Sequence, residues 1–192
     1  MDESHQSLEI EKISFREAVL KELKRQPLDL RREKSQTILE KLSHLKEFKT
    51  SHVVMFYVSM LEEVETLSLL QAVIKEGKTV TVPLVSRKSG LLVSVEIHDP
   101  NQDLEPGTYG IFEPKNHLIK PFDLSKIDFV IVPGIAFDRF GYRLGRGKGY
   151  YDRFLPTLPS HTFKVGLAFD FQVFDEIPKN ELDVKMNQVI TN

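Results

Sequence analysis

The sequence contains no cysteine among its 192 residues. Disulfides, thiolate-bound zinc, iron–sulfur clusters and a cysteine nucleophile are therefore excluded, and nothing in the chain requires an oxidising compartment. No apolar run approaches the roughly 18 residues that a membrane-spanning helix needs. The acidic and polar residues 1–12 also differ from a secretory signal, which would be basic and then apolar. We therefore expect a cytoplasmic protein without a membrane partner.

Two further catalytic patterns are missing. No two of the six histidines stand four residues apart, which is the spacing of a helical metal-binding pair. There is also no G-x-S-x-G segment to carry a serine nucleophile. Glycine and proline, at ten residues each, are too few for a collagen-like or broadly disordered chain. We therefore expect a folded protein whose function uses neither a serine nucleophile of this kind nor a helical histidine metal site.

The overall composition indicates one globular domain, residues 1–192, with 41% hydrophobic and 28% charged residues. A chain of this length buries about 70% of its unfolded surface without covalent links. The 26 Lys and Arg residues nearly balance the 28 Asp and Glu residues, for a net charge of −2. This balance argues against a general nucleic-acid binder, and we expect a monomer with small-molecule partners.

Hydrophobic patterning predicts an α/β fold with a mostly parallel sheet and helices on both faces. Short, nearly continuous apolar runs indicate buried strands, and a helix between residues 66 and 77 separates the first two. Asp29 and Thr66 are the expected helix caps, and Gly77 the expected terminating residue. Residues 99–121, rich in proline and turn residues, are expected to form an irregular loop. The predicted helices are 15–23, 29–45, 66–77 and 150–155, and the predicted strands are 52–59, 79–85, 91–97, 127–133, 165–169 and 188–191.

A glycine-rich basic segment carries the strongest functional signal. Gly145, Gly147 and Gly149 alternate with Arg146 and Lys148. Alternating glycines leave backbone amides unobstructed and permit positive φ angles, while the cations supply charge, so the segment suits a phosphate group. We expect it past the carboxyl end of the parallel strand 127–133, where open α/β sheets bind ligands.

Known phosphate-loop motifs do not describe this segment. The Walker form fails because Gly149 follows Lys148 and Tyr142 stands where its first glycine belongs, and the dinucleotide fingerprint fails because Tyr150 replaces its last glycine. The plain alternative is a solvated surface loop. Three glycines, four cations, two tyrosines and Asp152 at one junction favour a binding loop instead. One of Tyr150 and Tyr151 should pack inward while the other flanks a ring-bearing ligand, and the pattern leaves open which.

Three glutamates follow the first predicted strand. Glu62, Glu63 and Glu65 lie at its carboxyl end and could face the same crevice as the basic loop. Acidic residues are also favoured before a helix by its dipole, so a solvated turn is the alternative.

The segment PGIAFDRFGYRLGRGKGYYDRF, residues 133–154, resembles the central motif of the 5-formyltetrahydrofolate cyclo-ligase family without a gap. The resemblance extends over nearly the whole chain. Lys12 and Arg16 resemble the family's amino-terminal pair, and YVSMLEEVET resembles its folate-facing glutamate turn. GLAFDFQ and LDVKMNQVIT resemble its closing segments. The family's fold is an α/β sandwich related to sugar-phosphate isomerases and CoA transferases, in agreement with the patterning.

This resemblance implies that ATP and Mg²⁺ take part in the conversion of 5-formyltetrahydrofolate to 5,10-methenyltetrahydrofolate, with release of ADP and phosphate. The γ-phosphoryl group is transferred to the formyl oxygen, and N10 then closes the ring. Such a reaction depends on positioning and on charge neutralisation and needs no protein nucleophile. It therefore suits a chain without cysteine, a G-x-S-x-G serine or a helical histidine pair.

The resemblance also assigns roles residue by residue. Glu63 is expected to bond the donor edge of the pterin, and Tyr109 to stand near its ring. The catalytic residues are Arg146, Lys148 and Tyr151, and the metal ligands are Asp152 and Asp183. The ATP-binding residues are Lys12, Arg16, Arg143, Leu144, Gly145, Arg146, Gly147, Lys148, Gly149, Tyr150 and Tyr151. The substrate-binding residues are Val58, Glu63, Tyr109, Arg146, Gly147, Lys148, Gly149 and Tyr150.

Two rival functions fit parts of the pattern. A sugar-phosphate isomerase would use a phosphate loop and a carboxylate base without a nucleotide. An RNA-binding module would use the basic loop and its tyrosines, against the negative net charge. ATP dependence distinguishes the cyclo-ligase from the first, and salt-sensitive RNA retention would indicate the second.

Overall fold

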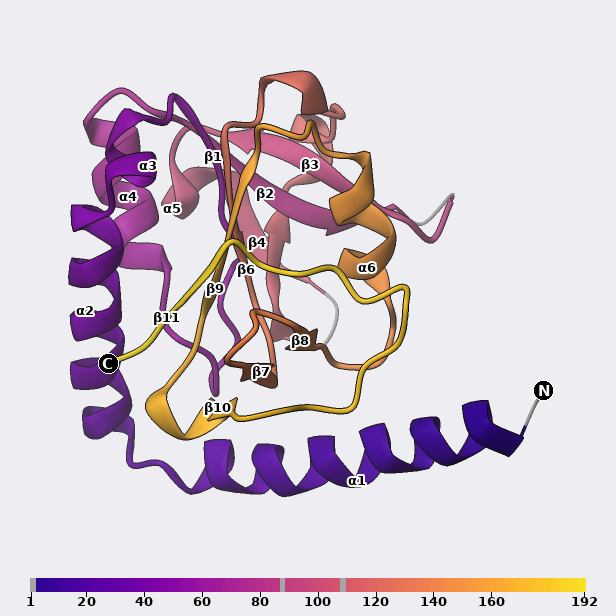
Figure 1. Cartoon of the computed structure of the whole chain (residues 1–192). Helices are drawn as coiled ribbons and strands as arrows, with labels where there is room; N and C mark the ends of the chain where they lie inside the picture. Colours follow the sequence, from indigo (N-terminus) through magenta and orange to yellow (C-terminus); the bar gives the residue numbers. More distant parts are fainter. Residues whose placement is uncertain (1–2, 87–88, 108–109) are drawn as a thin grey trace.

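A six-stranded sheet forms the centre of the molecule in a computed structural model that describes residues 3–86, 89–107 and 110–192 (Figure 1). The first five strands of its order pair in parallel, and only β3 runs antiparallel, against β2. The order is β11 (Gln188–Ile190), β9 (Phe163–Leu167), β6 (Phe129–Val132), β1 (Val53–Met55), β2 (Thr79–Val85) and β3 (Leu92–Ile97).

Both faces of the sheet are covered, because successive side chains of a strand point to opposite sides. Phe129 and Ile131 of β6 belong to one core cluster, while Val130 and Val132 belong to the other. The first cluster packs against α1 (Glu3–Arg25), α2 (Leu28–His44), α3 (Lys46–Thr50) and α4 (Leu67–Lys75). The second packs against α6 (Tyr150–Phe154) and η4 (Leu155–Thr157). The predicted α/β class with helices on both faces is confirmed, while the relation to isomerases and CoA transferases stays a prediction.

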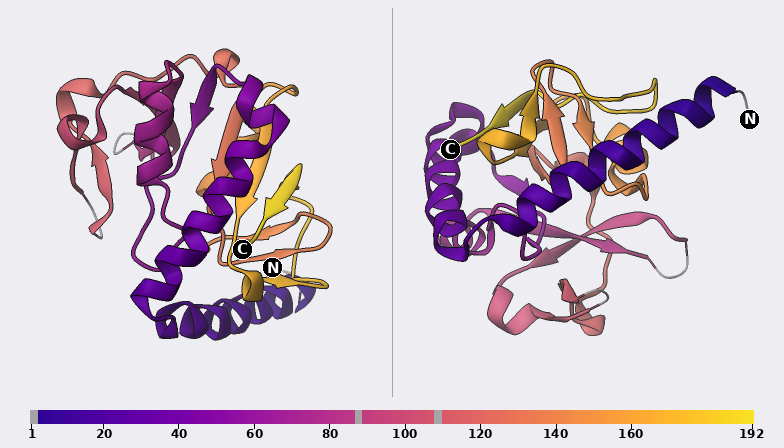
Figure 2. Two further views of the ribbon diagram at one scale, coloured as in Figure 1. Left: turned by 90° about the vertical axis from the view of Figure 1, so that its left-hand side faces the viewer. Right: turned by 90° about the horizontal axis from the view of Figure 1, so that it is seen from below.

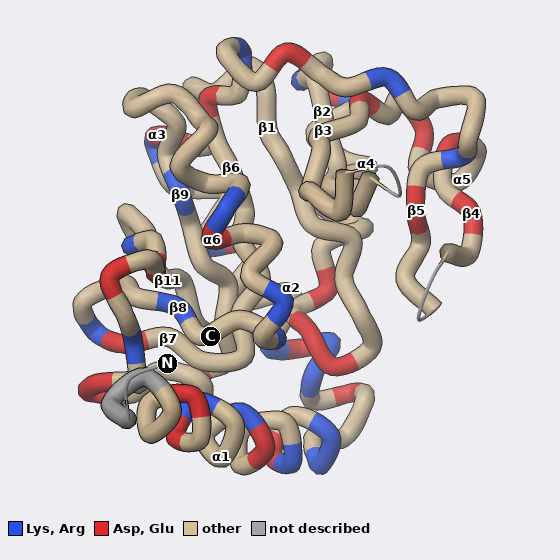
Figure 3. The backbone as a smooth tube through the Cα atoms, turned by 90° about the vertical axis from the view of Figure 1, so that its right-hand side faces the viewer, with Lys and Arg blue, Asp and Glu red and all other residues tan. Residues whose placement is uncertain are grey.

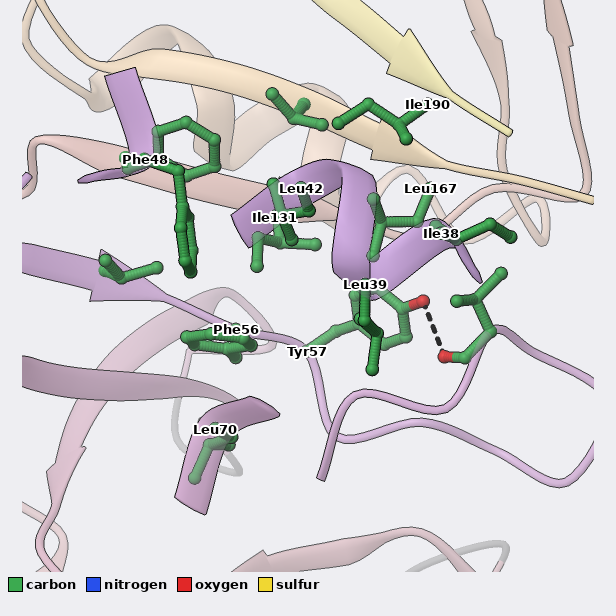
Figure 4. Packing of buried hydrophobic residues seen from close by; sticks show 14 of the residues in the cluster. Ile38, Leu39, Leu42, Phe48, Phe56, Tyr57, Leu70, Ile131, Leu167 and Ile190 are labelled. Atoms are coloured by element: carbon green, nitrogen blue, oxygen red, sulfur yellow. Dashed lines mark hydrogen bonds between the residues drawn. The ribbon is translucent and has the colours of Figure 1, made fainter. Parts of the chain in front are cut away.

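The packing of α2 shows how the first layer is held. Ile38, Leu39 and Leu42 lie against Ile131 and other buried residues of the sheet, including Leu167 and Ile190 (Figure 4). The dashed line in that view is the 2.8 Å hydrogen bond that the Tyr57 hydroxyl donates to the Val64 carbonyl. It closes the segment that leaves β1 and carries Glu62 and Glu63.

A second, three-stranded sheet was not predicted. Its order is β10 (Val173–Phe174), β7 (Ala136–Asp138) and β8 (Arg143–Leu144), and β7 and β8 form an antiparallel hairpin. The buried Asp138 accepts hydrogen bonds from the backbone amides of Phe140 and Tyr142, at 3.0 and 2.9 Å, and so closes the turn. Strands of two or three residues are too short to show a periodic pattern, so the sequence indicated only a loop here.

The prediction of an irregular loop over residues 99–121 was wrong in part. This region contains α5 (Pro100–Asp103), the hairpin of β4 (Leu104–Pro106) and β5 (Phe112–Pro114), and η2 (Asn116–Leu118). Asp99 caps α5 by accepting a hydrogen bond from the Asn101 amide at 2.9 Å. A second short 3₁₀ turn, η3 (Leu124–Lys126), precedes β6, and η5 (Asp170–Gln172) follows β9. Each of these pieces is only three or four residues long.

Several predicted boundaries also differ. Asp29 lies inside the first turn of α2, whose cap is Pro27, and β1 ends at Met55 well before residue 59. Thr66 is the N-cap residue of α4 as predicted, but its hydroxyl donates to the Tyr57 carbonyl at 2.7 Å and makes no capping hydrogen bond. Strand β9 begins two residues earlier than expected. At Thr66 a tertiary hydrogen bond replaces the local capping bond that the prediction used.

The helices of the described part of the chain include none with the length and apolar character that crossing a membrane requires.

Candidate active site

The glycine-rich loop lies at the carboxyl edge of the large sheet, but it does not follow a parallel strand directly. The β7–β8 hairpin intervenes between β6 and the loop, and the Ile135 amide donates to the Leu144 carbonyl at 2.8 Å. Helix α1 lies across the same edge, as the views from the side and from below show (Figures 1 and 2). The expected edge is therefore correct, and the immediate connection is different.

The three glycines of the loop serve two different purposes. Gly147 and Gly149 have φ angles of +92° and +63°, which ordinary side chains rarely adopt. A Cβ on Gly145 would lie 2.5 Å from Nη1 of Arg143. Glycine at this position therefore leaves room for the Arg143 side chain. The expected positive φ angles thus occur at two of the three glycines.

Helix α1 reaches the loop through Arg16. Its Nε donates to the Gly145 carbonyl at 2.8 Å, and its guanidinium carbon lies 3.4 Å from where a Cβ on Gly147 would be. One turn earlier, Lys12 is buried and pairs with Asp183 at 2.8 Å. The amino-terminal pair is therefore divided between the loop and the segment around residue 183.

An arginine also crosses to the glutamate turn. Arg146 donates from Nε and Nη2 to Oε1 of Glu63, at 3.2 and 3.1 Å, and its Nη2 lies 3.9 Å from Oε2 of Glu62. Figure 3 shows basic and acidic positions mixed along α1, at the same edge of the molecule. The other carboxylate oxygen of Glu63 accepts from the Met60 amide at 3.0 Å. The Glu63 side chain is only 12% exposed, whereas Glu65 is exposed. The solvated-turn alternative therefore describes Glu65 and not Glu63.

Beneath the loop, Arg143 joins α6 to the small sheet. Its Nη2 contacts Oδ1 of Asp152 at 2.6 Å, and Nη1 donates to the Pro133 carbonyl at 3.3 Å. Arg143 and Leu144 are both buried. Two residues expected to bind ATP thus lie under the loop, where they support it.

Tyr150 and Tyr151 are both partly buried and pack against the second core cluster, so the expected division into an inward and a ligand-facing ring stays a prediction. The Tyr151 hydroxyl is buried and has no hydrogen-bond partner among the described residues, and Arg143 lies over the Tyr151 ring at 5.5 Å. Burial raises the pKa of Tyr151 well above its ordinary value, Arg143 partly opposes the rise, and Glu63 adds to it. The partly buried Tyr150 ring carries Arg153 at 5.6 Å.

The two carboxylates expected to bind magnesium are each paired with a cation. Asp152 pairs with Arg143, and Asp183 pairs with Lys12. Across residues 3–86, 89–107 and 110–192, no three His, Cys, Asp or Glu side chains form a group that could hold a metal ion.

The remaining expected residues are placed as follows. Lys148 is exposed on the loop, and Val58 is partly buried after Tyr57, where the chain approaches the glutamate turn. Tyr109 lies outside the described residues.

Two supporting residues escaped the sequence analysis. The Gln172 amide nitrogen donates to the carbonyls of Gly134 and Ile135, at 3.0 and 2.9 Å, and so fixes the entry to the β7–β8 hairpin. Arg31 contacts the carbonyl of Leu61 at the start of the glutamate turn. Arg31 had a visible signal, because it precedes Ser35, Ile38 and Leu42 on one face of α2.

The fold and this arrangement define an α/β protein with a cationic loop, two cations of α1 and an acidic turn at the carboxyl edge of its sheet, the edge where open α/β sheets bind ligands. The model of the 5-formyltetrahydrofolate cyclo-ligase family matches residues 9–192. The chain belongs to this family, and it is an enzyme of the cyclo-ligase class.

Individual relatives agree with this assignment. A probable 5-formyltetrahydrofolate cyclo-ligase from Caenorhabditis elegans is 34% identical over 165 residues, which cover 81% of this chain and 80% of the relative. The 5-formyltetrahydrofolate cyclo-ligase of Escherichia coli strain K12 is 34% identical over 143 residues, with 73% and 78% covered. The Aquifex aeolicus 5,10-methenyltetrahydrofolate synthetase has a similar structure, with a TM-score of 0.81, 35% identity, and coverage of 93% and 88%. Family membership sets aside the isomerase and RNA-binding alternatives.

Proposed function

We propose that this chain converts 5-formyltetrahydrofolate to 5,10-methenyltetrahydrofolate with hydrolysis of ATP to ADP and phosphate. The observation that carries the proposal is the meeting of three segments distant in the sequence. Arg16 of α1 bonds to the loop at Gly145, and Arg146 of the same loop bonds to Glu63. A cationic region suited to phosphates thus lies next to an acidic group suited to the donor edge of a pterin.

The reaction proceeds in two bond-forming steps. The formyl oxygen attacks the γ-phosphorus of ATP, the bond to the β-phosphate oxygen breaks, and ADP leaves. N10 then attacks the activated formyl carbon and loses its proton, and the carbon–oxygen bond breaks to release phosphate. Phosphorylation converts a poor leaving group into a good one, so no covalent bond to the protein is needed.

The cations supply the electrostatic part of catalysis. In the proposal, Lys12, Arg16 and the exposed Lys148 neutralise the triphosphate, with backbone amides of the loop beside them. Arg146 and Lys148 stabilise the negative charge that develops on the transferring phosphoryl group, and the partly buried Tyr151 lies beside the reacting atoms. Arg143, Leu144 and Asp152 hold the loop from below through the contacts described above.

The folate contacts fall on the other side of Arg146. Glu63 keeps a carboxylate near the loop through its bonds to Arg146 and to the Met60 amide. We propose that this carboxylate accepts hydrogen bonds from the pterin and that Val58 contacts its ring. The loop residues from Arg146 to Tyr150 then lie between the folate and the nucleotide.

The described residues fit a magnesium ion only as separate single ligands, because they form no three-member group and each aspartate is already paired. This suits an ion that arrives with phosphate oxygens and takes one or two carboxylates from the protein. Asp152, with Asp183 as the second ligand, would hold it. When bound, magnesium would neutralise charge on the phosphoryl group.

The proposal is tested by mixing purified protein with 5-formyltetrahydrofolate, ATP and Mg²⁺ and recording the absorbance of the methenyl product. We expect stoichiometric formation of ADP, phosphate and product, and no product when either ATP or Mg²⁺ is omitted. Product formed at the same rate without ATP would contradict the mechanism. Absence of product with every component present would contradict the function.

We also propose that the chain works as a cytoplasmic monomer of one domain. Its support is the sequence alone, namely the absence of cysteine and the single set of patterned elements. Light scattering after size-exclusion chromatography should give a mass near 22.1 kDa. A dimer mass would contradict it.

A further inference from the structure

The buried face of α2 contains an arginine where its neighbours are apolar or small. Arg31 is 8% exposed and precedes Ser35, Ile38 and Leu42 at helical spacing, all of them buried. A guanidinium group is rarely buried without partners, because removing its charge from water is unfavourable. Its contacts therefore indicate what the position is for.

Arg31 joins two segments that carry residues of the proposed site. Its Nη1 donates to the carbonyl of Leu61, the first residue of the turn 61–65. Its Nη2 donates to the carbonyls of Leu23 and Gln26, at 3.4 and 3.1 Å, at the carboxyl end of α1. These carbonyls have no further helical partner, and a cation at a helix carboxyl end is favourable.

Ser35, one turn further along α2, holds the opposite side of the same turn. Its Oγ accepts from the Glu65 amide at 3.1 Å. The turn is thus attached to α2 on both sides of Glu63, at Leu61 and at Glu65. Neither bond involves the Glu63 side chain, which remains directed to Arg146.

We propose that Arg31, assisted by Ser35, is a positioning residue that fixes the Glu63 turn relative to α1 and thereby sets the affinity for the reduced folate. The inference rests on the proposed function for the substrate, while the positioning itself rests on the contacts alone. The hydrogen bonds of Arg31 to described residues go to the turn and to the end of α1, and none goes to the glycine-rich loop. It acts through the backbone of the turn, since a carboxylate that bonds a pterin must be held within a fraction of an ångström.

Arg31→Gln is the primary test, because glutamine keeps a polar group but is too short to bridge both segments. Arg32→Gln is the matched control, since Arg32 is the next residue, carries the same charge and is exposed. We expect Arg31→Gln to raise KM for 5-formyltetrahydrofolate about tenfold and to leave KM for ATP within about twofold. The control should alter neither. Equal KM values in both variants would overturn the inference.

Hydrogen exchange of the full-length chain provides a readout that does not depend on activity. The amides of Glu63 and Glu65 are bonded to the Met60 carbonyl and to Ser35, respectively. We expect their exchange to accelerate in Arg31→Gln and, for Glu65, in Ser35→Ala, but not in Arg32→Gln. Unchanged exchange in Arg31→Gln would overturn the positioning role even if the proposed reaction were confirmed.

Arg31→Lys separates positioning from loss of folding. Lysine retains the charge and reaches one carbonyl, so we expect an intermediate KM for folate and intermediate exchange at Glu63. If Arg31→Gln unfolds, Arg31→Lys and Ser35→Ala decide the question by the same two measurements. If the wild-type chain lacks the proposed activity while exchange responds as expected, the proposed function fails and the positioning role stands.

Discussion

Lys148 differs from the other cations near the glycine-rich loop in its surroundings. Arg16 is bonded to a backbone carbonyl, Arg143 to Asp152, and the exposed Arg146 to Glu63, whereas the exposed Lys148 side chain has no hydrogen bond or ion pair to a described residue. A cation that already has a partner must share or exchange it when an anionic ligand arrives. Lys148 can therefore bind a phosphate without giving up such a partner, whereas Arg16 and Arg146 would have to share or exchange theirs.

We expect Lys148→Ala to lower kcat/KM for ATP at least 100-fold, because it removes a charge directed to the transferring phosphoryl group. The midpoint of thermal unfolding should change by no more than a degree or two, since the side chain is exposed. Lys75→Ala, an exposed lysine at the opposite edge of the sheet, is the control. An unchanged rate in Lys148→Ala would remove its proposed role.

Glu63→Gln should weaken binding of the reduced folate about tenfold and leave ATP binding nearly unchanged. The amide keeps the shape of the side chain but loses the charge that pairs with Arg146 and would accept from the pterin. Calorimetry with each ligand measures both effects. Glu65→Gln makes the same chemical change at an exposed position of the same turn and should have no effect. Intact folate affinity in Glu63→Gln would return Glu63 to a structural role.

At the scale of elements, the site depends on how α1, the loop and the glutamate turn meet at one sheet edge. The Phe15 and Phe174 rings pack edge to face at 4.8 Å, which holds α1 against β10 near Arg16. The β7–β8 hairpin then places the loop next to α1, where Arg16 bonds to the Gly145 carbonyl. The turn, attached to α2, completes the arrangement. A small change in any of these contacts should alter function more than stability.

Gly147→Ala tests the contact between the loop and α1, and Gly77→Ala is its control. The two glycines have similar φ angles, +92° and +89°, so both variants should lose about 1 kcal/mol of stability from backbone strain. A Cβ at Gly77 would have no atom within 4 Å, whereas one at Gly147 would lie in van der Waals contact with the Arg16 guanidinium, at 3.4 Å, and would occupy space beside this cation. Only Gly147→Ala should therefore lower ATP affinity, by roughly fivefold. Equal ATP affinity in the two variants would contradict an active role for the loop–helix contact.

On the scale of the whole molecule, the hydroxyl groups of two tyrosines, Tyr57 after β1 and Tyr151 in α6, are buried. Burial raises the pKa of Tyr57 well above its ordinary value, with smaller contributions from Glu63 and Tyr151. Tyr151 has its pKa raised for the same leading reason. Both hydroxyls therefore stay protonated in the folded chain at a pH where they ionise in the unfolded chain.

This difference predicts loss of stability at alkaline pH. Below about pH 10 both states keep the protons, and above it only the folded state does, so the unfolding free energy falls by about 1.4 kcal/mol per pH unit for each tyrosine. Tyr151→Phe removes one such group together with an unpartnered buried hydroxyl. Urea unfolding between pH 9 and 11 should show a shallower decline in this variant. The same decline in both proteins would contradict the assignment.

Much of the fold could be predicted from the sequence because long apolar patterns determine it. The strands over residues 79–85 and 188–191, the helix from residue 150 and the glycine at 77 agree closely with the structure. The sequence did not predict the two-residue strands or the short elements of residues 100–118, because pieces of two to four residues show no periodic pattern. It also did not predict that the Thr66 hydroxyl bonds to the Tyr57 carbonyl, nine residues away in the sequence.

The glycine-rich basic loop, the amino-terminal pair and the glutamates were all visible in the sequence, since their chemistry depends on residue type and spacing. Their mutual contacts were not. Only the tertiary structure pairs Arg146 with Glu63, Lys12 with Asp183 and Arg143 with Asp152, and only it reveals Arg31 as the link between α1 and the turn. A local pattern specifies what a side chain can do, whereas the partner of a charge is decided by which segments the packed sheet brings to the same edge.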